Sequence, residues 1–325
     1  MHGRAREGWP VIWRSLLLLI LACAGAAAQA APQHKRIALT FDDVPRMPGA
    51  FFTPDERTRR LIAALRASGV RQAAFFVNPG NLEQPYGKGG EARIRAYVRA
   101  GHVIANHSYS HKHLSELTAE AYVADLDRGA AWLKGRTGLR PWYRYPFLDE
   151  GFGDIAKRDA VRAALRARGL HNGYVTSDSN DWLMEALTLE AKAKGETIDL
   201  AALKALYIRT IVGAADFSDA LARKALGRSP IQVMLMHETD LEAMFVADAV
   251  RALKSDGWEI VSADAAFADP IAREEPQSVR TNMGQIAAMA DARGVPAAEL
   301  ANPAFGERAI KRAFAAEILH KAPNP

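Results

Sequence analysis

Short apolar segments alternate with longer amphipathic segments along most of this chain of 325 residues, and this alternation constrains the fold more than any other feature. The short segments have the length of β-strands, whereas the long ones repeat apolar side chains every three or four residues, as helices do. Strands are expected at residues 37–41, 72–77, 102–105, 142–145, 171–176, 231–236 and 258–261. Strands that alternate with helices are typical of right-handed β-α-β units and of a parallel sheet.

The helices are expected at residues 54–67, 91–100, 118–135, 159–168, 183–226 and 241–254. The helical insertion at about 183–226 is long for a single connection, and Gly195 and Gly213 are expected to interrupt it. About seven β-α units fit before residue 270, which favours a closed or nearly closed α/β barrel. Residues 271–325 show no strand pattern, so we expect a main domain at 31–270 followed by a helical C-terminal extension.

Composition excludes several classes of protein. With 49% hydrophobic and 24% charged residues and a net charge of +5, the chain does not have the composition of a disordered protein. Its single cysteine, Cys23, excludes a disulfide framework and a cysteine-ligated zinc site in a monomer, so a metal site would need His, Asp or Glu. Basic and acidic residues are interspersed without a basic stripe, and we therefore expect no nucleic-acid partner.

The first residues have the pattern of an export signal. Residues 1–30 contain an Arg-rich start, an apolar run at 16–21 and a small-x-small cleavage site at 28–30. The apolar run is too short to span a bilayer, so we expect no stable membrane span once the signal is cleaved. The expected protein is periplasmic or secreted, and lipoprotein anchoring at Cys23 is a minor alternative.

Polar residues follow five of the expected strands. They are Asp42 and Asp43 after the first strand, His107 and His111 after the third, Arg144 at the end of the fourth, Asp178 and Asp181 after the fifth, and His237 at the end of the sixth. In parallel α/β folds, functional side chains gather at the carboxyl ends of the strands. This convergence is the main argument from sequence for an active site.

Two pairs among these residues have the chemistry of a metal site. The spacing of four between His107 and His111 predicts two imidazoles on one face of a helical turn, where both can bind one divalent ion. Of the neighbouring Asp42 and Asp43, one carboxylate could complete the ligand set while the other acts as a base. Surface histidines at a chance spacing, and carboxylates that cap a helix, remain the alternatives at this point.

These segments resemble, in order, the five motifs of the polysaccharide deacetylases, the NodB-homology enzymes of carbohydrate esterase family four. The matching segments are Thr40-Phe41-Asp42-Asp43, His107-Ser108-Tyr109-Ser110-His111, Arg144-Tyr145-Pro146-Phe147, Asp181-Trp182 and Leu235-Met236-His237. Together they extend over about residues 37–268, most of the chain after the signal. The third motif departs from the family, because Tyr145, Phe147 and Leu148 stand where Pro, Tyr and Gly are usual.

The resemblance implies a distorted (β/α)7-type barrel and a zinc-dependent hydrolase that removes acetyl groups from a carbohydrate. It implies that Asp43, His107 and His111 bind Zn²⁺, or another divalent transition metal such as Co²⁺. Asp42 would be the general base, held by Arg144.

The resemblance also assigns the remaining candidate residues. His237, oriented by Asp181, would protonate the leaving group. The backbone N–H of Phe147 would stabilise the oxyanion, and Trp182 and Leu235 would line the pocket for the acetyl methyl group.

The substrate partner implied is an acetylated polysaccharide or oligosaccharide. The first hypothesis is removal of N-acetyl groups from N-acetylglucosamine units of peptidoglycan or of a chitin-like polymer. The alternatives are an O-acetyl esterase acting on xylan, and a carbohydrate-binding protein without turnover, which would be expected to lack some of the metal or base residues. The segments at 78–90 and 183–226 are expected to form the walls of the substrate groove.

Overall fold

Strand β1 (Lys35–Val44) is the centre of the sheet, because it pairs in parallel with three other strands. These partners are β2 (Ala74–Val77), β7 (Gln232–His237) and β8 (Trp258–Ile260). The structure is a computed structural model, and it describes residues 34–322. The expected signal peptide at 1–30, with Cys23, lies outside the described residues.

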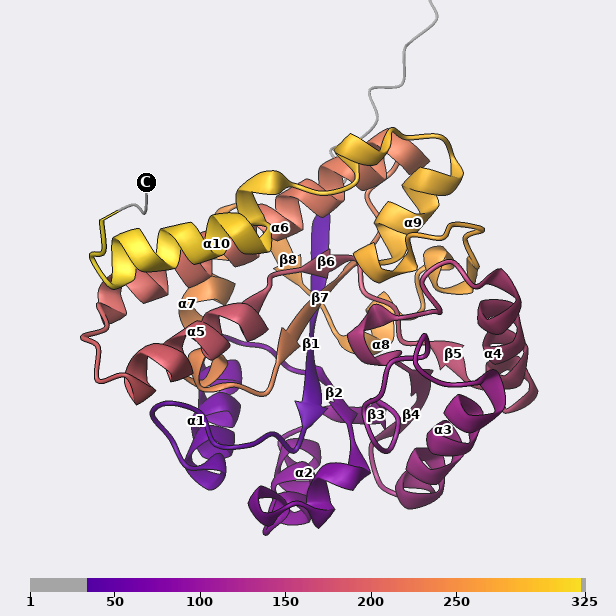
Figure 1. The fold of residues 1–325 in the computed structure, drawn as a ribbon, viewed down its shortest axis with the longest axis horizontal. Coiled ribbons are helices and arrows are strands. Elements are labelled where there is room, and N and C mark those ends of the chain that lie inside the picture. Colours follow the sequence, from indigo (N-terminus) through magenta and orange to yellow (C-terminus); the bar gives the residue numbers. More distant parts are fainter. Residues whose placement is uncertain (1–33, 323–325) are drawn as a thin grey trace, which may run out of the picture. The chain divides into compact units, whose positions relative to one another are not determined.

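The remaining strands extend the sheet on both sides of β1. They are β3 (Val103–Asn106), β4 (Leu139–Tyr143), β5 (His171–Asn172) and β6 (Ser177–Asp178). The order is β5-β4-β3-β2-β1-β7-β6, with β8 beside β1, and every pairing is parallel. Figure 1 shows this sheet curling around the centre of the described chain. The α/β fold with a distorted barrel of parallel strands is therefore confirmed.

The two ends of the curled sheet are joined by the chain itself. The expected strand at 171–176 was correct only for its first two residues, which form β5 and continue the sheet beyond β4. The next four residues cross to the opposite end, where β6 pairs with β7. Gly173 N–H still donates to the carbonyl of Tyr143 on β4, whereas Thr176 N–H donates to that of Val233 on β7. Residues 173–176 thus form a seam that closes the barrel covalently.

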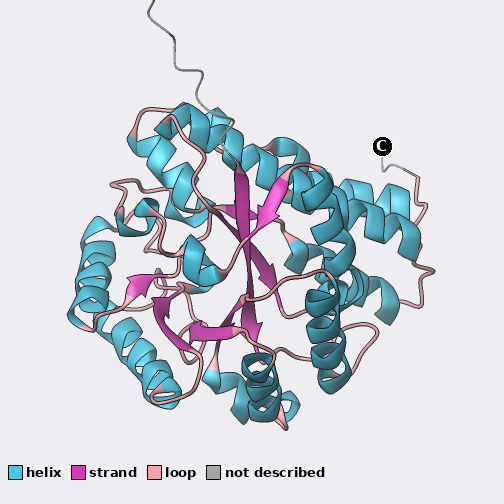
Figure 2. Cartoon of the chain, turned by 180° about the vertical axis from the view of Figure 1, so that it is seen from behind, coloured by secondary structure: helices cyan, strands magenta, loops and turns pink. Residues whose placement is uncertain are grey.

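Helices surround the strands, as Figure 2 shows from behind. Those of the barrel are α1 (Pro54–Ala67), α2 (Gly90–Arg99), α3 (Ala119–Leu133), α4 (Ile155–Ala167), α5 (Asp181–Ala193), α6 (Leu200–Leu226), α7 (Asp240–Ser255) and α8 (Ala263–Ala266). Helix α1 illustrates how the sequence sets them. Thr53 caps it by accepting a hydrogen bond from Glu56 N–H, and Pro54 occupies the first turn. Leu61 and Leu65 then face the core.

Strand β1 has apolar side chains on both faces, because each face packs against a cluster of buried side chains. Ile37, Leu39 and Phe41 belong to the largest buried cluster, which includes side chains of α1 and α7. Ala38 points to the other face, into a cluster that includes the C-terminal residues. A strand buried on both faces appears in the sequence as a continuous apolar run, and this explains why β1 was easy to recognise.

The expected interruption at Gly213 was wrong, although the one at Gly195 was correct. Gly195 lies between α5 and α6 with a φ of 69°, whereas α6 continues through Gly213. A Cβ atom at position 213 would lie only 2.0 Å from Cζ of Phe305. Gly213 therefore allows an aromatic ring from the C-terminal segment to approach the helix, and does not break it.

The C-terminal segment, residues 270–322, packs along the barrel. It contains α9 (Gln285–Ala292) and α10 (Glu307–Ala313), together with several short 3₁₀ turns. Helix α9 contacts α6, and α10 contacts α5. No helix of the described chain is long and apolar enough to cross a membrane.

Candidate active site

The two neighbouring carboxylates near the end of β1 face different cations. Asp42 is only 3% exposed, and its Oδ1 accepts a hydrogen bond from Nη1 of Arg144 at 2.7 Å. Asp43 has a left-handed backbone, with a φ of 65°, and its Oδ2 accepts a hydrogen bond from Nη1 of Arg46 at 2.6 Å. The two carboxylates therefore have different arginine partners, although Oδ2 of Asp42 and Oδ1 of Asp43 both lie near Nε2 of His107, at 3.5 and 3.6 Å.

The two histidines come together through a loop. His107 and His111 do not lie on a helical turn, so the predicted local structure was wrong while the predicted proximity was correct. Ser108 and His111 have left-handed φ angles of 65° and 52°, and His111 N–H donates to Oγ of Ser108. The carboxylate of Asp125 accepts hydrogen bonds from two further N–H groups of this loop.

Asp43, His107 and His111 are arranged as metal ligands. One ligand atom from each lies within 4.8 Å of the others. Oδ1 of Asp43 lies 3.1 Å from Nε2 of His111 and 3.6 Å from Nε2 of His107. This oxygen is buried and has no hydrogen-bond partner among the described residues. A buried carboxylate oxygen without a donor, facing two imidazole nitrogens, fits a divalent cation.

The protonation states of His107 and Asp43 also suit metal binding. Burial lowers the pKa of His107 to about 4, so its ring is neutral at ordinary pH, and Nδ1 lies 2.9 Å from the carbonyl of Arg144. That contact leaves Nε2 with its lone pair toward Asp43. Burial opposes ionisation of Asp43, but His111 and Arg46 outweigh it and hold its pKa well below the ordinary value. A neutral imidazole and a carboxylate are ligands that zinc and other divalent transition metals bind.

Arg144 connects the base candidate to the seam of the barrel. Its guanidinium is fully buried and bonds Oδ1 of Asp42 and Oγ1 of Thr40. It also donates to the carbonyls of Gly173 and Tyr174 at 2.6 and 3.1 Å. Arg144 thus orients Asp42 and satisfies backbone groups that no strand pairs.

His237 and Asp181 are joined by two hydrogen bonds. Nδ1 of His237 lies 2.9 Å from Oδ1 of Asp181, and the backbone N–H of His237 donates to Oδ2 at 2.7 Å. Burial lowers the pKa of His237, but the charge and hydrogen bond of Asp181 outweigh it and raise that pKa to about 9. A histidine held protonated, with Nε2 free of Asp181, can act as a general acid.

Removing the charge of Asp181 is expected to lower the pKa of His237 in the metal-free protein from about 9 to below the ordinary 6.5, because burial then remains the main influence. The raised pKa means that protonated His237 stabilises the fold fully below about pH 6.5, and that this contribution is lost as pH rises through about 9. NMR titration of the imidazole in wild type and Asp181→Asn measures the shift. An unchanged pKa would contradict the role of Asp181.

One cavity of about 1010 Å³ brings the candidate residues together. Among the predicted residues it is lined by Asp42, Asp43, His107, His111, Phe147, Trp182, Leu235 and His237. Arg144 and Asp181 are fully buried behind it. Four further lining residues, Arg46, Asn180, Asn282 and Glu307, were not found from the sequence. Arg46 and Asn180 had a local signal, because one follows the first motif by three residues and the other directly precedes the fourth.

The walls of this cavity differ from the expectation. Of the described residues that line it, none comes from either expected segment, 78–90 or 183–226, so this prediction was wrong. Trp182 of α5 contributes to one wall. Asn282 and Glu307 contribute from the C-terminal segment, which had no functional signal in the sequence.

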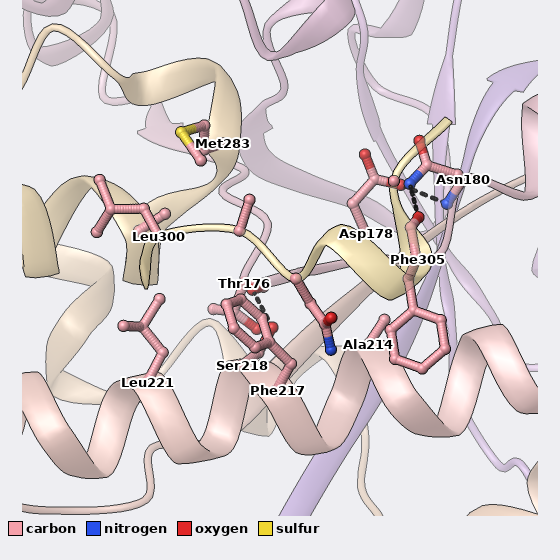
Figure 3. A pocket seen from close by; sticks show the side chains of 14 residues that line it. Thr176, Asp178, Asn180, Ala214, Phe217, Ser218, Leu221, Met283, Leu300 and Phe305 are labelled. Carbon is pink, nitrogen blue, oxygen red and sulfur yellow. Dashed lines mark hydrogen bonds between the residues drawn. The ribbon is translucent and has the colours of Figure 1, made fainter. Parts of the chain in front are cut away.

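A second cavity, of about 620 Å³, lies between α6 and the C-terminal segment (Figure 3). It shares Asp178 and Asn180 with the first cavity. The side-chain amide of Asn180 donates to the carbonyl of Phe305 at 3.1 Å, and this bond ties the C-terminal segment to the edge of the site.

The unusual third motif still forms a tight turn. Phe147 and Leu148 have left-handed φ angles of 57° and 52°. The N–H groups of Leu148 and Asp149 donate to the carbonyls of Tyr145 and Pro146, so the turn does not use the N–H of Phe147. The ring of Phe147 stacks on His113, with centroids 3.7 Å apart.

Part of this chain matches a known protein family. Residues 29–171 match the model of the polysaccharide deacetylase family. Those residues belong to that family. The matched residues contain the first three motifs, and the last two follow at Asp181-Trp182 and Leu235-Met236-His237.

Curated proteins with a similar sequence include deacetylases of fungi and bacteria. Chitin deacetylase 1 of Cryptococcus neoformans var. grubii is 29% identical over 172 residues, which are 50% of this chain and 32% of that protein. Peptidoglycan-N-acetylglucosamine deacetylase of Bacillus cereus is 29% identical over 131 residues, which are 40% of this chain and 41% of that protein. The matches thus span less than half the length of these relatives.

Solved structures also resemble this chain. The family 4 carbohydrate esterase from Streptomyces lividans, in complex with acetate, has a TM-score of 0.47 and 22% identity, covering 72% of this chain and 97% of that one. The Xyl-CE4 domain of a multidomain xylanase from the hindgut metagenome of Trinervitermes trinervoides has a TM-score of 0.47 and 18% identity, covering 72% and 90%.

Proposed function

We propose that this chain is a zinc-dependent deacetylase that removes N-acetyl groups from N-acetylglucosamine units of a chitin-like polymer or peptidoglycan. The observation that carries the proposal is that Asp42 and Asp43 have different partners. One carboxylate is bound by a buried arginine, and the other turns a free oxygen toward two histidines. The chitin and peptidoglycan deacetylases among its relatives support the choice of substrate.

The residues of the chain supply the acid and base chemistry. Asp42 accepts the proton of the attacking water, and Arg144 orients its carboxylate. A divalent ion held by Asp43, His107 and His111 would supply Lewis-acid activation of the acetyl carbonyl and of the water.

Other residues of the cavity protonate the leaving group and stabilise the oxyanion. His237 protonates the leaving nitrogen, since an amine is expelled only after protonation. The N–H of Phe147 donates to the developing oxyanion, and Trp182 and Leu235 surround the acetyl methyl group.

Acetate release is the direct test. The purified protein, stripped of metal and then reloaded with zinc, is expected to release acetate from N-acetylated chitooligosaccharides or from peptidoglycan. Acetylated xylan is assayed beside them, and release from xylan alone would make the chain an O-acetyl esterase. Stoichiometric zinc without release from any substrate would contradict the proposed substrates, and no zinc and no release would leave a carbohydrate-binding protein.

We also propose that the protein is exported through its N-terminal signal, as the pattern of residues 1–30 indicates. The mass of the mature protein recovered outside the cytoplasm tests this. A mass that includes residues 1–30 would contradict cleavage.

A further inference from the structure

Arg46 lines the cavity and contacts the candidate metal ligand Asp43. It does not belong to any of the five motifs. Its Nη1 donates to Oδ2 of Asp43 at 2.6 Å, and its side chain is 23% exposed. A charge-assisted bond of this length is among the stronger hydrogen bonds in proteins. It occupies one of the two carboxylate oxygens.

The other oxygen of Asp43 has the opposite environment. Oδ1 is buried and has no hydrogen-bond partner among the residues that the structure describes. It faces Nε2 of His111 and of His107 at 3.1 and 3.6 Å. The two oxygens of one carboxylate are thus divided, with Oδ2 committed to an arginine and Oδ1 turned toward the two imidazoles.

The backbone of Arg46 is held by the core. Its N–H donates to Oε2 of Glu238 at 2.8 Å, and its carbonyl accepts from Nη2 of Arg57 at 2.7 Å. Both Glu238 and Arg57 are fully buried. Since these contacts involve only the backbone, the position of Arg46 is set before any ion binds and survives a change of its side chain.

We propose that Arg46 is a positioning residue that holds Asp43 as a ligand through Oδ1 alone; this rests on the metal-dependent function proposed above. The guanidinium stops Oδ2 from turning toward the ion and fixes the direction of Oδ1. Hydrogen bonds to ligating groups act in this way, and losing one typically weakens metal binding by about 10- to 100-fold.

The charge of Arg46 has the opposite effect, because a cation near the site repels another cation. Its side chain is partly exposed, so solvent screens this repulsion, whereas the hydrogen bond to Asp43 is direct. We therefore expect orientation to outweigh repulsion. Removing the side chain should weaken metal binding, whereas repulsion as the larger effect would strengthen it.

The test compares zinc affinity, by competition with a chelator, in wild type, Arg46→Met, Arg46→Lys and Arg95→Met. Arg95 is the matched control, because its side chain is exposed and, among residues 34–322, forms its ion pair with Glu91 on α2. Arg46→Met is expected to bind zinc about tenfold or more weakly, Arg46→Lys to recover part of the loss, and Arg95→Met to match wild type.

A spectroscopic measurement reports the ligand arrangement without substrate. With Co²⁺ in place of zinc, Arg46→Met is expected to show weaker visible absorption bands, since a carboxylate that binds through both oxygens raises the coordination number. Unchanged affinity and an unchanged spectrum would overturn the inference, and so would tighter binding. Wild type that binds no metal would instead overturn the proposed function. Melting curves of both Arg46 variants check that the fold is retained.

Discussion

Replacing Asp42 with asparagine is expected to lower turnover by about 10²- to 10⁴-fold while the metal content stays unchanged. The asparagine side chain would have nearly the same shape and could still accept the hydrogen bond of Arg144, but it could not take a proton from water. Asp42 also lies outside the group of ligand atoms formed by Asp43, His107 and His111. Its loss should therefore affect the chemical step and leave metal binding intact.

The neighbouring carboxylate provides the matched control. Asp43→Asn is expected to lose metal together with activity, because Oδ1 of Asp43 is the oxygen that faces both histidines. Metal analysis and acetate release, measured on both variants, separate the two roles. Loss of metal from Asp42→Asn with retention in Asp43→Asn would reverse the assignment.

Replacing Arg144 with methionine is expected to reduce the free energy of unfolding by about 3–5 kcal/mol and to abolish activity. The change leaves the carboxylate of Asp42 buried without its cation. It also leaves the carbonyls of Gly173 and Tyr174 without their donor, in the seam that joins the two ends of the sheet. Both losses occur in the interior, where water cannot replace the guanidinium.

Urea denaturation of the metal-free protein measures this effect. The control is Arg140→Met on β4, the strand that Arg144 directly follows, because Arg140 is partly exposed and pairs with a partly exposed Asp264. A pair of that kind contributes about 1 kcal/mol or less. Equal stability of the two variants would show that the seam does not depend on Arg144.

The sequence predicted the strands and the strand ends well, because both have local signals. Asp42, Asp43 and His237 directly follow or end apolar runs, and these runs became β1 and β7. The spacing of His107 and His111 predicted their proximity for the wrong reason. Their loop depends on left-handed residues, including Ser108, which no local rule would place there.

What the sequence could not predict depends on contacts between distant segments. The split of residues 171–176 follows from the pairing of β5 and β6 with strands at opposite ends of the sheet. The role of Gly213 follows from a ring about ninety residues later in the chain. Asn282 and Glu307 reach the cavity only because the C-terminal segment packs against the barrel.

That packing places two residues of the cavity wall on a segment that lies beyond all five motifs. A shortened protein that ends after β8 would keep every motif residue, but it would lose Asn282 and Glu307 from the wall of the cavity. Phe305 would no longer cover Gly213 or accept the bond of Asn180. Since side chains of this segment also belong to the buried core, we expect a change in it to alter the stability of the fold and the shape of the cavity together.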